Sequence, residues 1–113
     1  MTQITASMVT FDCSEVLPLA RWWAQATGGT LTEENESFSV VSYDGAGPNL
    51  GFQQVPDVTP GKNRVHLDLH VEDSAAEVAR LIDAGATLVG HREEGGFGWT
   101  TLADPAGNQF CVA

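Results

Sequence analysis

The segment that decides the fold is Val65–Val71, whose sequence is VHLDLHV. In this segment apolar residues alternate with the polar residues His66, Asp68 and His70 without an exception. Alternation with a period of two is typical of a β-strand that packs one face against a core and exposes the other. The three polar side chains are therefore predicted to share the open face of this strand.

A short helix is predicted directly after this strand. The segment Ser74–Glu77 has the Ser-x-x-Glu form of a capping box, an apolar stripe follows it, and Gly85 is suited to end the helix. Short strands are expected at residues 87–90, 99–103 and 109–112. The second half of the chain therefore has the predicted order βαβββ.

The first half of the chain repeats the pattern of the second. Tetrads of the form Asp-x-Ala-Gly begin at Asp44 and Asp104, 60 residues apart, and each is predicted to form a hairpin turn. The same offset aligns residues 6–11 with residues 66–71. The first half is therefore expected to have the order βαβββ as well.

The helix of the first half is predicted between Pro18, which suits a first helical turn, and Gly28. It is followed by expected strands at residues 30–31, 38–43 and 50–55. Two further segments lack a clear pattern. We expect Glu33–Glu36 to form a solvated turn and Glu93–Gly98 to form a mobile flap.

The prolines and the glycine of Pro56–Gly61 indicate a linker between the halves. We expect one domain over residues 1–113, with module one at 3–56, a linker at 57–62 and module two at 63–113. A single domain is expected because neither half, at about 55 residues, easily buries both faces of its own sheet.

Composition excludes several classes of protein. With 42% hydrophobic and 18% charged residues, the chain is neither disordered nor fibrous. Fifteen acidic residues against five basic ones give a net charge of −10, which argues against nucleic acid and anionic membranes as partners. No apolar run approaches the roughly 18 residues of a membrane span, and no export signal precedes the domain, so a cytoplasmic location is expected. Cys13 and Cys111 are expected to be reduced.

Three strings of residues, taken together, resemble the vicinal oxygen chelate superfamily, which has the glyoxalase, bleomycin-resistance and dioxygenase fold. They are the helix that carries Trp22-Trp23 into Thr27–Gly29, the string Lys62–Asp68 and the ending Asp104–Cys111. The nearest branch is that of small glyoxalase-like domains. The resemblance implies an α+β fold in which two βαβββ modules form a mostly antiparallel, cup-shaped sheet, and it implies a homodimer.

In metal-dependent members of this superfamily, His and Glu ligands come from the first and last strands of each module. His66 matches the first-strand position of module two, and its module-one counterpart falls, by the offset of 60, on Ala6. The last-strand positions fall on Cys111 and on Gln53 or Gly51. Because only one of four positions keeps a usual ligand, we expect no obligatory metal. If an ion is bound, His66 and Cys111 are expected to hold it.

Two further polar residues follow His66 on the same strand face. In an extended strand the Cβ atoms of Asp68 and His70 lie roughly 7 and 13 Å from that of His66. His66 and His70 are therefore not expected to share one ion unaided.

The candidate ligand contacts inside the cup are four polar residues and two apolar ones. They are His66, Gln53, Asp68, Cys111, Met8 and Trp99. Four of them have a structural alternative: His66 as an imidazole bonded to neighbouring strands, Asp68 as the partner of Arg64 or Arg21, and Cys111 and Trp99 as core residues.

Three functions follow from this reading. The first is a protein that binds a small organic molecule in its cup without an obligatory metal or other cofactor. The alternative is a divalent-metal-dependent lyase, isomerase or dioxygenase, and the third is an interaction module whose cup is filled by its own side chains. The sequence leaves the ligand, the reaction and the arrangement of a dimer open.

Overall fold

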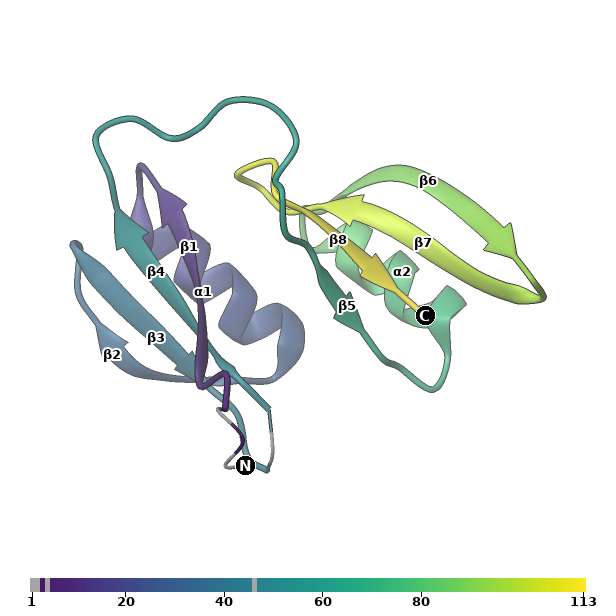
Figure 1. The fold of residues 1–113 in the computed structure, drawn as a ribbon, viewed down its shortest axis with the longest axis horizontal. Coiled ribbons are helices and arrows are strands. Elements are labelled where there is room, and N and C mark those ends of the chain that lie inside the picture. Colours follow the sequence, from purple (N-terminus) through teal and green to yellow (C-terminus); the bar gives the residue numbers. More distant parts are fainter. Residues whose placement is uncertain (1–2, 4, 46) are drawn as a thin grey trace. The chain divides into compact units, whose positions relative to one another are not determined.

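The structure is a computed structural model that describes residue 3, residues 5–45 and residues 47–113. The chain divides into two compact units, with the boundary between Thr59 and Pro60 (Figure 1). Each unit has one helix and a four-stranded sheet in the order βαβββ. The predicted α+β class and the two βαβββ modules are thereby confirmed. That the two units fold as one domain stays a prediction.

Unit one contains five elements. They are β1 (Met8–Cys13), α1 (Val16–Thr27), β2 (Thr30–Glu34), β3 (Phe38–Ser42) and β4 (Asn49–Gln54). The strand order is β1-β4-β3-β2, and β1 runs parallel to β4 whereas the other neighbours are antiparallel.

The core of unit one lies between α1 and its sheet. Trp23 of α1 and Phe52 of β4 are fully buried. The ring of Phe11 on β1 lies 5.3 Å from that of Trp23 and 5.0 Å from that of Phe52. Because side chains alternate along a strand, Met8 and Thr10 point to the opposite face of the sheet, away from α1.

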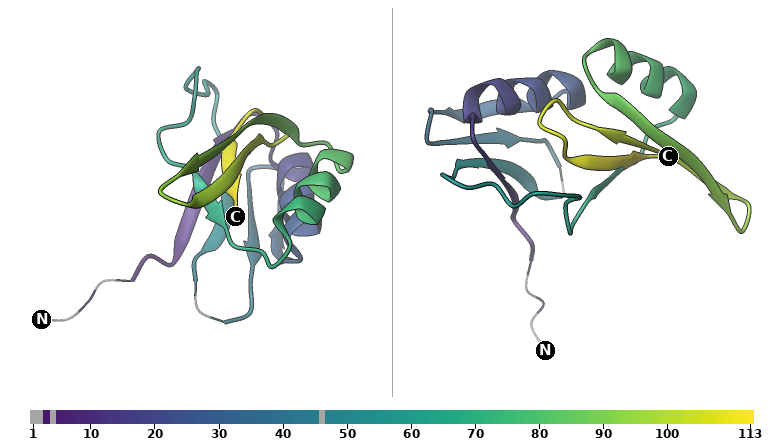
Figure 2. Two further views of the ribbon diagram at one scale, coloured as in Figure 1. Left: turned by 90° about the vertical axis from the view of Figure 1, so that its right-hand side faces the viewer. Right: turned by 90° about the horizontal axis from the view of Figure 1, so that it is seen from above.

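Unit two repeats the arrangement. Its elements are β5 (Leu67–Leu69), α2 (Ser74–Asp83), β6 (Thr87–Glu94), β7 (Phe97–Ala103) and β8 (Gln109–Val112). The order is β5-β8-β7-β6, with β5 parallel to β8 and the other pairs antiparallel (Figures 1 and 2). Among the residues described, no helix is both long and apolar enough to span a membrane.

The core of unit two is built from one face of the sheet and from α2. Leu102, Phe110 and Val112 are almost completely buried, and Leu81 is the buried residue of α2. By alternation, Thr101 and Cys111 point to the other face of the sheet. This other face therefore carries polar side chains.

The first strand of unit two is shorter than the alternation predicts. It covers Leu67–Leu69, and only these three residues pair with β8. Val65 lies outside the ladder and is 73% exposed. The alternating pattern therefore extends beyond the hydrogen-bonded strand, because β8, at four residues, is too short to pair with all of it.

Two predicted loops are in fact regular structure. Glu93–Gly98 is the end of a β-hairpin, in which Gly95 and Gly96, both with positive φ, form the turn between β6 and β7. Consecutive residues with positive φ are the requirement of a tight hairpin turn, which is what the two glycines form. The mobility of this segment stays a prediction. In unit one, Glu33 and Glu34 likewise belong to β2, which contains an irregularity in register between Leu31 and Glu33.

The second Asp-x-Ala-Gly tetrad forms the predicted turn between β7 and β8. The buried carboxylate of Asp104 accepts hydrogen bonds from the backbone N–H groups of Ala106 (2.9 Å) and Asn108 (2.8 Å) and from the Asn108 side chain. In the first tetrad Asp44 is exposed, and Ala46 lies outside the described residues.

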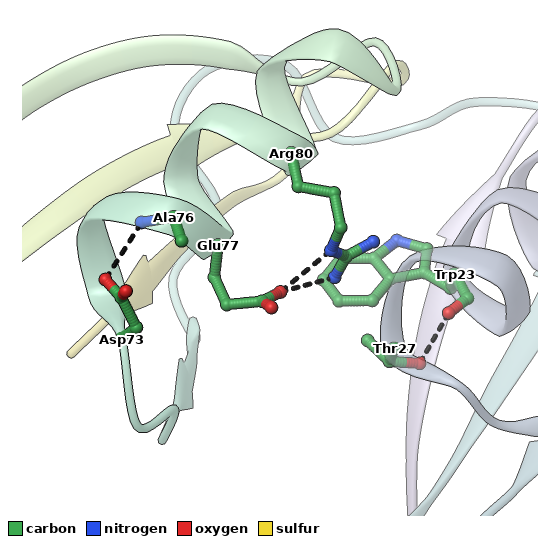
Figure 3. A network of polar contacts seen from close by, with 6 residues as sticks. All are labelled: Trp23, Thr27, Asp73, Ala76, Glu77 and Arg80. Atoms are coloured by element: carbon green, nitrogen blue, oxygen red, sulfur yellow. Dashed lines mark hydrogen bonds and ion pairs between the residues drawn. The ribbon is translucent and has the colours of Figure 1, made fainter.

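The helix ends differ in how they are capped (Figure 3). α1 ends at Gly28, which has a φ of +75°, and the Thr27 hydroxyl donates to the Trp23 carbonyl. The same hydroxyl lies 2.6 Å from that of Tyr43. Burial raises the pKa of Tyr43, and the bond to Thr27 offsets part of this rise.

The start of α2 corrects the predicted capping box. The cap is Asp73, whose side chain accepts a hydrogen bond of 3.1 Å from the N–H of Ala76, and Ser74 is the first helical residue. Glu77 does not reach back to the cap but pairs with Arg80 (Figure 3). Asp and Ser are comparable caps, so the sequence rule misplaced the helix start by one residue.

Substitution of the two residues tests this assignment. We expect Asp73→Ala to lower the free energy of unfolding by about 1 kcal/mol, because an N–H of the first turn loses its partner. Ser74→Ala is the matched control and should change it by less than about 0.5 kcal/mol. Urea denaturation followed by circular dichroism measures both. A larger loss for Ser74→Ala than for Asp73→Ala contradicts the assignment.

Candidate functional site

A pocket of about 700 Å³ lies on unit two, and all the described residues that line it belong to that unit. Its floor is the sheet face that carries Thr101 of β7 and Cys111 of β8. The structure brings four of the predicted contacts together in the lining, namely His66, Asp68, Cys111 and Trp99.

The strand registers order these side chains across the pocket. Asp68 of β5 is paired with Cys111, Cys111 with Thr101, and Thr101 with Gly90 of β6. These residues therefore form one row across the sheet.

A second row across the same sheet face lies two residues further along. Trp99 is paired with Arg92 of β6, and Phe97 follows on the same face as Trp99. The pocket floor therefore has a polar side at β5 and β8 and an aromatic side at β7, with a basic residue at the β6 edge.

His66, Asp68 and Cys111 form the polar cluster of the pocket. One ligand atom from each lies within 4.8 Å of the others, and His66 Nε2 is 3.3 Å from Asp68 Oδ1. The Cys111 thiol also lies 3.4 Å from the Thr101 hydroxyl. The side chains of His66 and Asp68 are 45% and 78% exposed, so the cluster is open to solvent.

The side chains of His66 and Asp68 meet because His66 precedes β5 and its ring turns toward the carboxylate. This geometry corrects one expectation. The ion-pair partner of Asp68 is His66 and neither predicted arginine. Arg21 instead pairs with Glu34 at 2.9 Å.

The other two predicted contacts, Met8 and Gln53, belong to unit one. Both lie on the sheet face turned away from α1, Met8 on β1 and an exposed Gln53 on β4. Met8 covers Gly51 closely, since a Cβ atom on Gly51 would lie 2.6 Å from the Met8 sulfur and 2.9 Å from the Thr10 hydroxyl.

The registers also correct the predicted counterpart of His66. Thr10 pairs with Gly51 across the parallel strands of unit one, as Asp68 pairs with Cys111 in unit two. Met8, two residues before Thr10, therefore corresponds to His66, and Ala6 does not. The offset of 60 holds for the last strands of the units, whereas the first strands are offset by two residues less.

Unit two supplies ligand types that suit a metal ion, and unit one does not. Imidazole, thiolate and carboxylate are all zinc ligands, and three protein ligands are the usual number at a catalytic zinc site. At the corresponding positions unit one has Met8, Thr10 and Gly51, which offer a thioether, a neutral hydroxyl and no side chain. The four-position His and Glu site of metal-dependent relatives is therefore not reproduced.

Comparison with known families identifies this arrangement. The model of the family described as glyoxalase-like domain matches residues 8–113. The chain belongs to the glyoxalase-like domain family. A search of curated proteins finds no match to this glyoxalase-like domain.

Solved structures show the same fold. A glyoxalase/bleomycin resistance protein/dioxygenase family enzyme from Burkholderia phytofirmans PsJN is 21% identical with a TM-score of 0.80, and the match covers 94% of each chain. A glyoxalase-related enzyme from Fulvimarina pelagi is 19% identical with a TM-score of 0.78, covering 100% of this chain and 88% of that one.

A third solved structure with this fold holds an organic ligand. It is a bleomycin-binding protein from Streptomyces verticillus complexed with copper(II)-bleomycin, 15% identical with a TM-score of 0.68, and the match covers 100% of this chain and 98% of that one. At these identities the comparison shows that the glyoxalase-like domain shares its fold with all three structures, and it shows no more than that.

Sequence reasoning missed several residues that line the pocket, among them Lys62, Arg92, Phe97 and Thr101. Arg92 was missed because the strand prediction stopped at Gly90, and Phe97 because residues 93–98 were predicted to form a flap. Reading residues 91–99 as a hairpin around Gly95-Gly96 places Arg92 beside Trp99. The two adjacent glycines were the signal that was available.

The two cysteines of the domain provide a direct test of the pocket geometry. Cys111 is part-exposed in the pocket, whereas Cys13 is 4% exposed and bonded to the Gln53 carbonyl. We expect iodoacetamide to modify Cys111 at least about 10-fold faster than Cys13 in the native protein, since access controls alkylation. Peptide mass spectrometry measures both rates. In urea the two rates should converge, and equal rates in the native protein contradict the assigned geometry.

Proposed function

We propose that this glyoxalase-like domain binds a small, partly apolar organic molecule in the unit-two pocket without requiring a metal ion. The observation that carries the proposal is the composition of the pocket. An aromatic side formed by Phe97 and Trp99 faces the same space as the polar cluster of His66, Asp68 and Cys111.

The size of the pocket suits a small molecule. Ligand sites commonly have volumes of roughly 300 to 1,000 Å³, and this pocket has about 700 Å³. Most such sites combine an apolar wall with a few polar groups that orient the ligand. Both parts are present here on one sheet face.

The aromatic side is exposed to an extent that favours a ligand. The rings of Phe97 and Trp99 lie 6.1 Å apart at an interplanar angle of 31°, and Phe97 is 60% exposed. Exposed aromatic surface is costly in water, and offset stacking on a planar ring recovers this free energy. A ligand with a flat apolar part is therefore the best match.

The polar side can orient such a ligand. The Thr101 hydroxyl and the His66 ring both donate and accept hydrogen bonds, and Asp68 accepts them. The bleomycin-binding protein of Streptomyces verticillus is a precedent for an organic ligand on this fold. Contacts from Met8 and Gln53 of unit one, and a homodimer, stay predictions.

Removal of the aromatic side tests the proposal. A series of naphthalene-ring compounds of different charge serves as the set of probes, and saturation-transfer NMR and calorimetry detect binding. We expect at least one probe to bind at one site per chain. We expect Trp99→Ala to lower the affinity for this probe by about 10-fold. Leu88→Ala, which removes an exposed apolar side chain outside the pocket lining, is the control and should have no effect. Absence of binding by every probe contradicts the proposal.

A metal-dependent enzyme is the second candidate, because three possible ligands already lie within 4.8 Å of one another. His66, Asp68 and Cys111 would hold the ion. A bound Zn²⁺ would polarise paired oxygens of a substrate or lower the pKa of a water molecule. Asp68 is not among the four ligand positions that the family resemblance implies.

Zinc binding separates the two candidates. For the metal-free binding protein we expect a chelator to leave both the melting temperature and the affinity for a bound probe unchanged. For the enzyme we expect one equivalent of zinc in equilibrium dialysis, and a loss of at least about 10-fold in zinc affinity with His66→Ala. His91→Ala is the matched control, because His91 contacts Thr100 and Glu93 outside the pocket. Stoichiometric zinc that survives purification and is needed for probe binding contradicts the first candidate.

A further inference from the structure

Positive charge is concentrated at the pocket of an otherwise acidic protein. The chain has five Lys and Arg residues against fifteen Asp and Glu residues. Lys62 and Arg92 both line the pocket. Arg21 and Arg80 are held in surface ion pairs with glutamates (Figure 3 shows Arg80). Two of the three remaining cations therefore face the same cavity.

The guanidinium of Arg92 is available to a ligand. Within residues 3, 5–45 and 47–113, no hydrogen bond or ion pair involves the side chain of Arg92 or of Lys62. Glu94 lies two residues beyond Arg92 on β6 but does not line the pocket. An exposed arginine without a partner at the edge of a cavity is a group that an anion can bind at little desolvation cost.

The acidic residue of the pocket is remote from Arg92. Asp68 is on β5 and Arg92 is on β6, at opposite edges of the four-stranded sheet. Three strand spacings separate these edges, which corresponds to roughly 14 Å. The carboxylate of Asp68 also lies against His66. Repulsion of an anion by Asp68 is therefore weak at the β6 edge.

Arg92 and the aromatic side of the pocket form one continuous surface. Arg92 is directly paired with Trp99 in the β6/β7 register, and Phe97 follows on the same face. A planar ring that stacks on Trp99 therefore has the guanidinium at its margin. The flat fork of an arginine matches a carboxylate, which it binds through two parallel hydrogen bonds.

We propose that the ligand of this pocket is an aromatic carboxylate, whose ring stacks on Phe97 and Trp99 and whose carboxylate binds Arg92. This inference rests on the proposed function and names the class of ligand. The far end of the ligand points to the polar cluster, where a hydroxyl or carbonyl group finds His66 and Thr101 as partners.

Lys62 has a secondary role in this proposal. It precedes Asn63, whose side chain bonds the backbone of Gln109 at the start of β8. Trp99 lies beside the opposite end of β8, because Thr100 is paired with Val112. Lys62 therefore raises the local potential for an anion without contacting its carboxylate.

Three probes with the same ring test the class of ligand. They are 2-naphthoate, its neutral amide 2-naphthamide, and the cationic 2-naphthylmethylammonium, each titrated by calorimetry at about 0.15 M salt. We expect 2-naphthoate to bind at least about 10-fold more tightly than the amide, and we expect the cation to bind most weakly. Inorganic phosphate is included to detect binding of an anion without a ring.

Variants of Arg92 test the assigned contact. Arg92→Gln should lower the affinity for 2-naphthoate by about 10-fold, and it should change the affinity for 2-naphthamide by less than about 2-fold. Arg92→Lys keeps the charge but loses the fork, so an intermediate loss is expected. The matched control is Arg64→Gln, which removes the same charge from an exposed residue of unit two outside the pocket lining and should leave both probes unchanged.

The outcomes distinguish this inference from the proposed function. If the amide binds as tightly as the carboxylate, or if Arg64→Gln costs as much as Arg92→Gln, the ligand class is wrong while binding in the pocket stands. If phosphate competes fully with 2-naphthoate, the site is a general anion site and the aromatic carboxylate is overturned. If none of the three ring probes binds, the proposed function itself fails.

Discussion

The parallel pairing of β5 with β8 is the constraint on which the site of unit two depends. It consists of three residue pairs, extended by backbone hydrogen bonds from the Val71 N–H to Ala113 and from the Ala113 N–H to Leu69. Asp68 and Cys111 are neighbours only because of this pairing, since α2, β6 and β7 lie between them in the chain. Parallel neighbours require such a long crossover. The polar cluster is therefore a product of the whole unit and not of one segment.

The same topology in the two units carries different chemistry. Each has a parallel pair at one edge of its sheet, with Thr10 opposite Gly51 in one and Asp68 opposite Cys111 in the other. In unit one Met8 lies over the glycine and fills the space that a side chain would occupy. The repeated backbone thus holds a polar cluster in one copy and a packed apolar contact in the other.

Local sequence rules predicted the elements well and the details of their ends less well. The strand at residues 109–112 and the stop of α1 at Gly28 are confirmed. The start of α2 was misplaced by one residue, because Asp73 and Ser74 are both good caps. The hairpin at Gly95-Gly96 was read as a flap because glycine is equally common in mobile loops and in tight turns. Arg92 was absent from the predicted site because the strand before this hairpin was ended at Gly90.

The sequence by itself determined the class of fold, since alternation, helix stops and the internal repeat are local patterns that need no partner to be recognised. It also determined which side chains are available, including the single matching ligand His66. Only the tertiary structure decided which of them meet. Register between strands that are distant in the chain is set by packing, and a shift of two residues moved the counterpart of His66 from Ala6 to Met8. The same packing placed Arg92 beside Trp99, because cross-strand neighbours depend on where a hairpin turns and not on spacing along the chain.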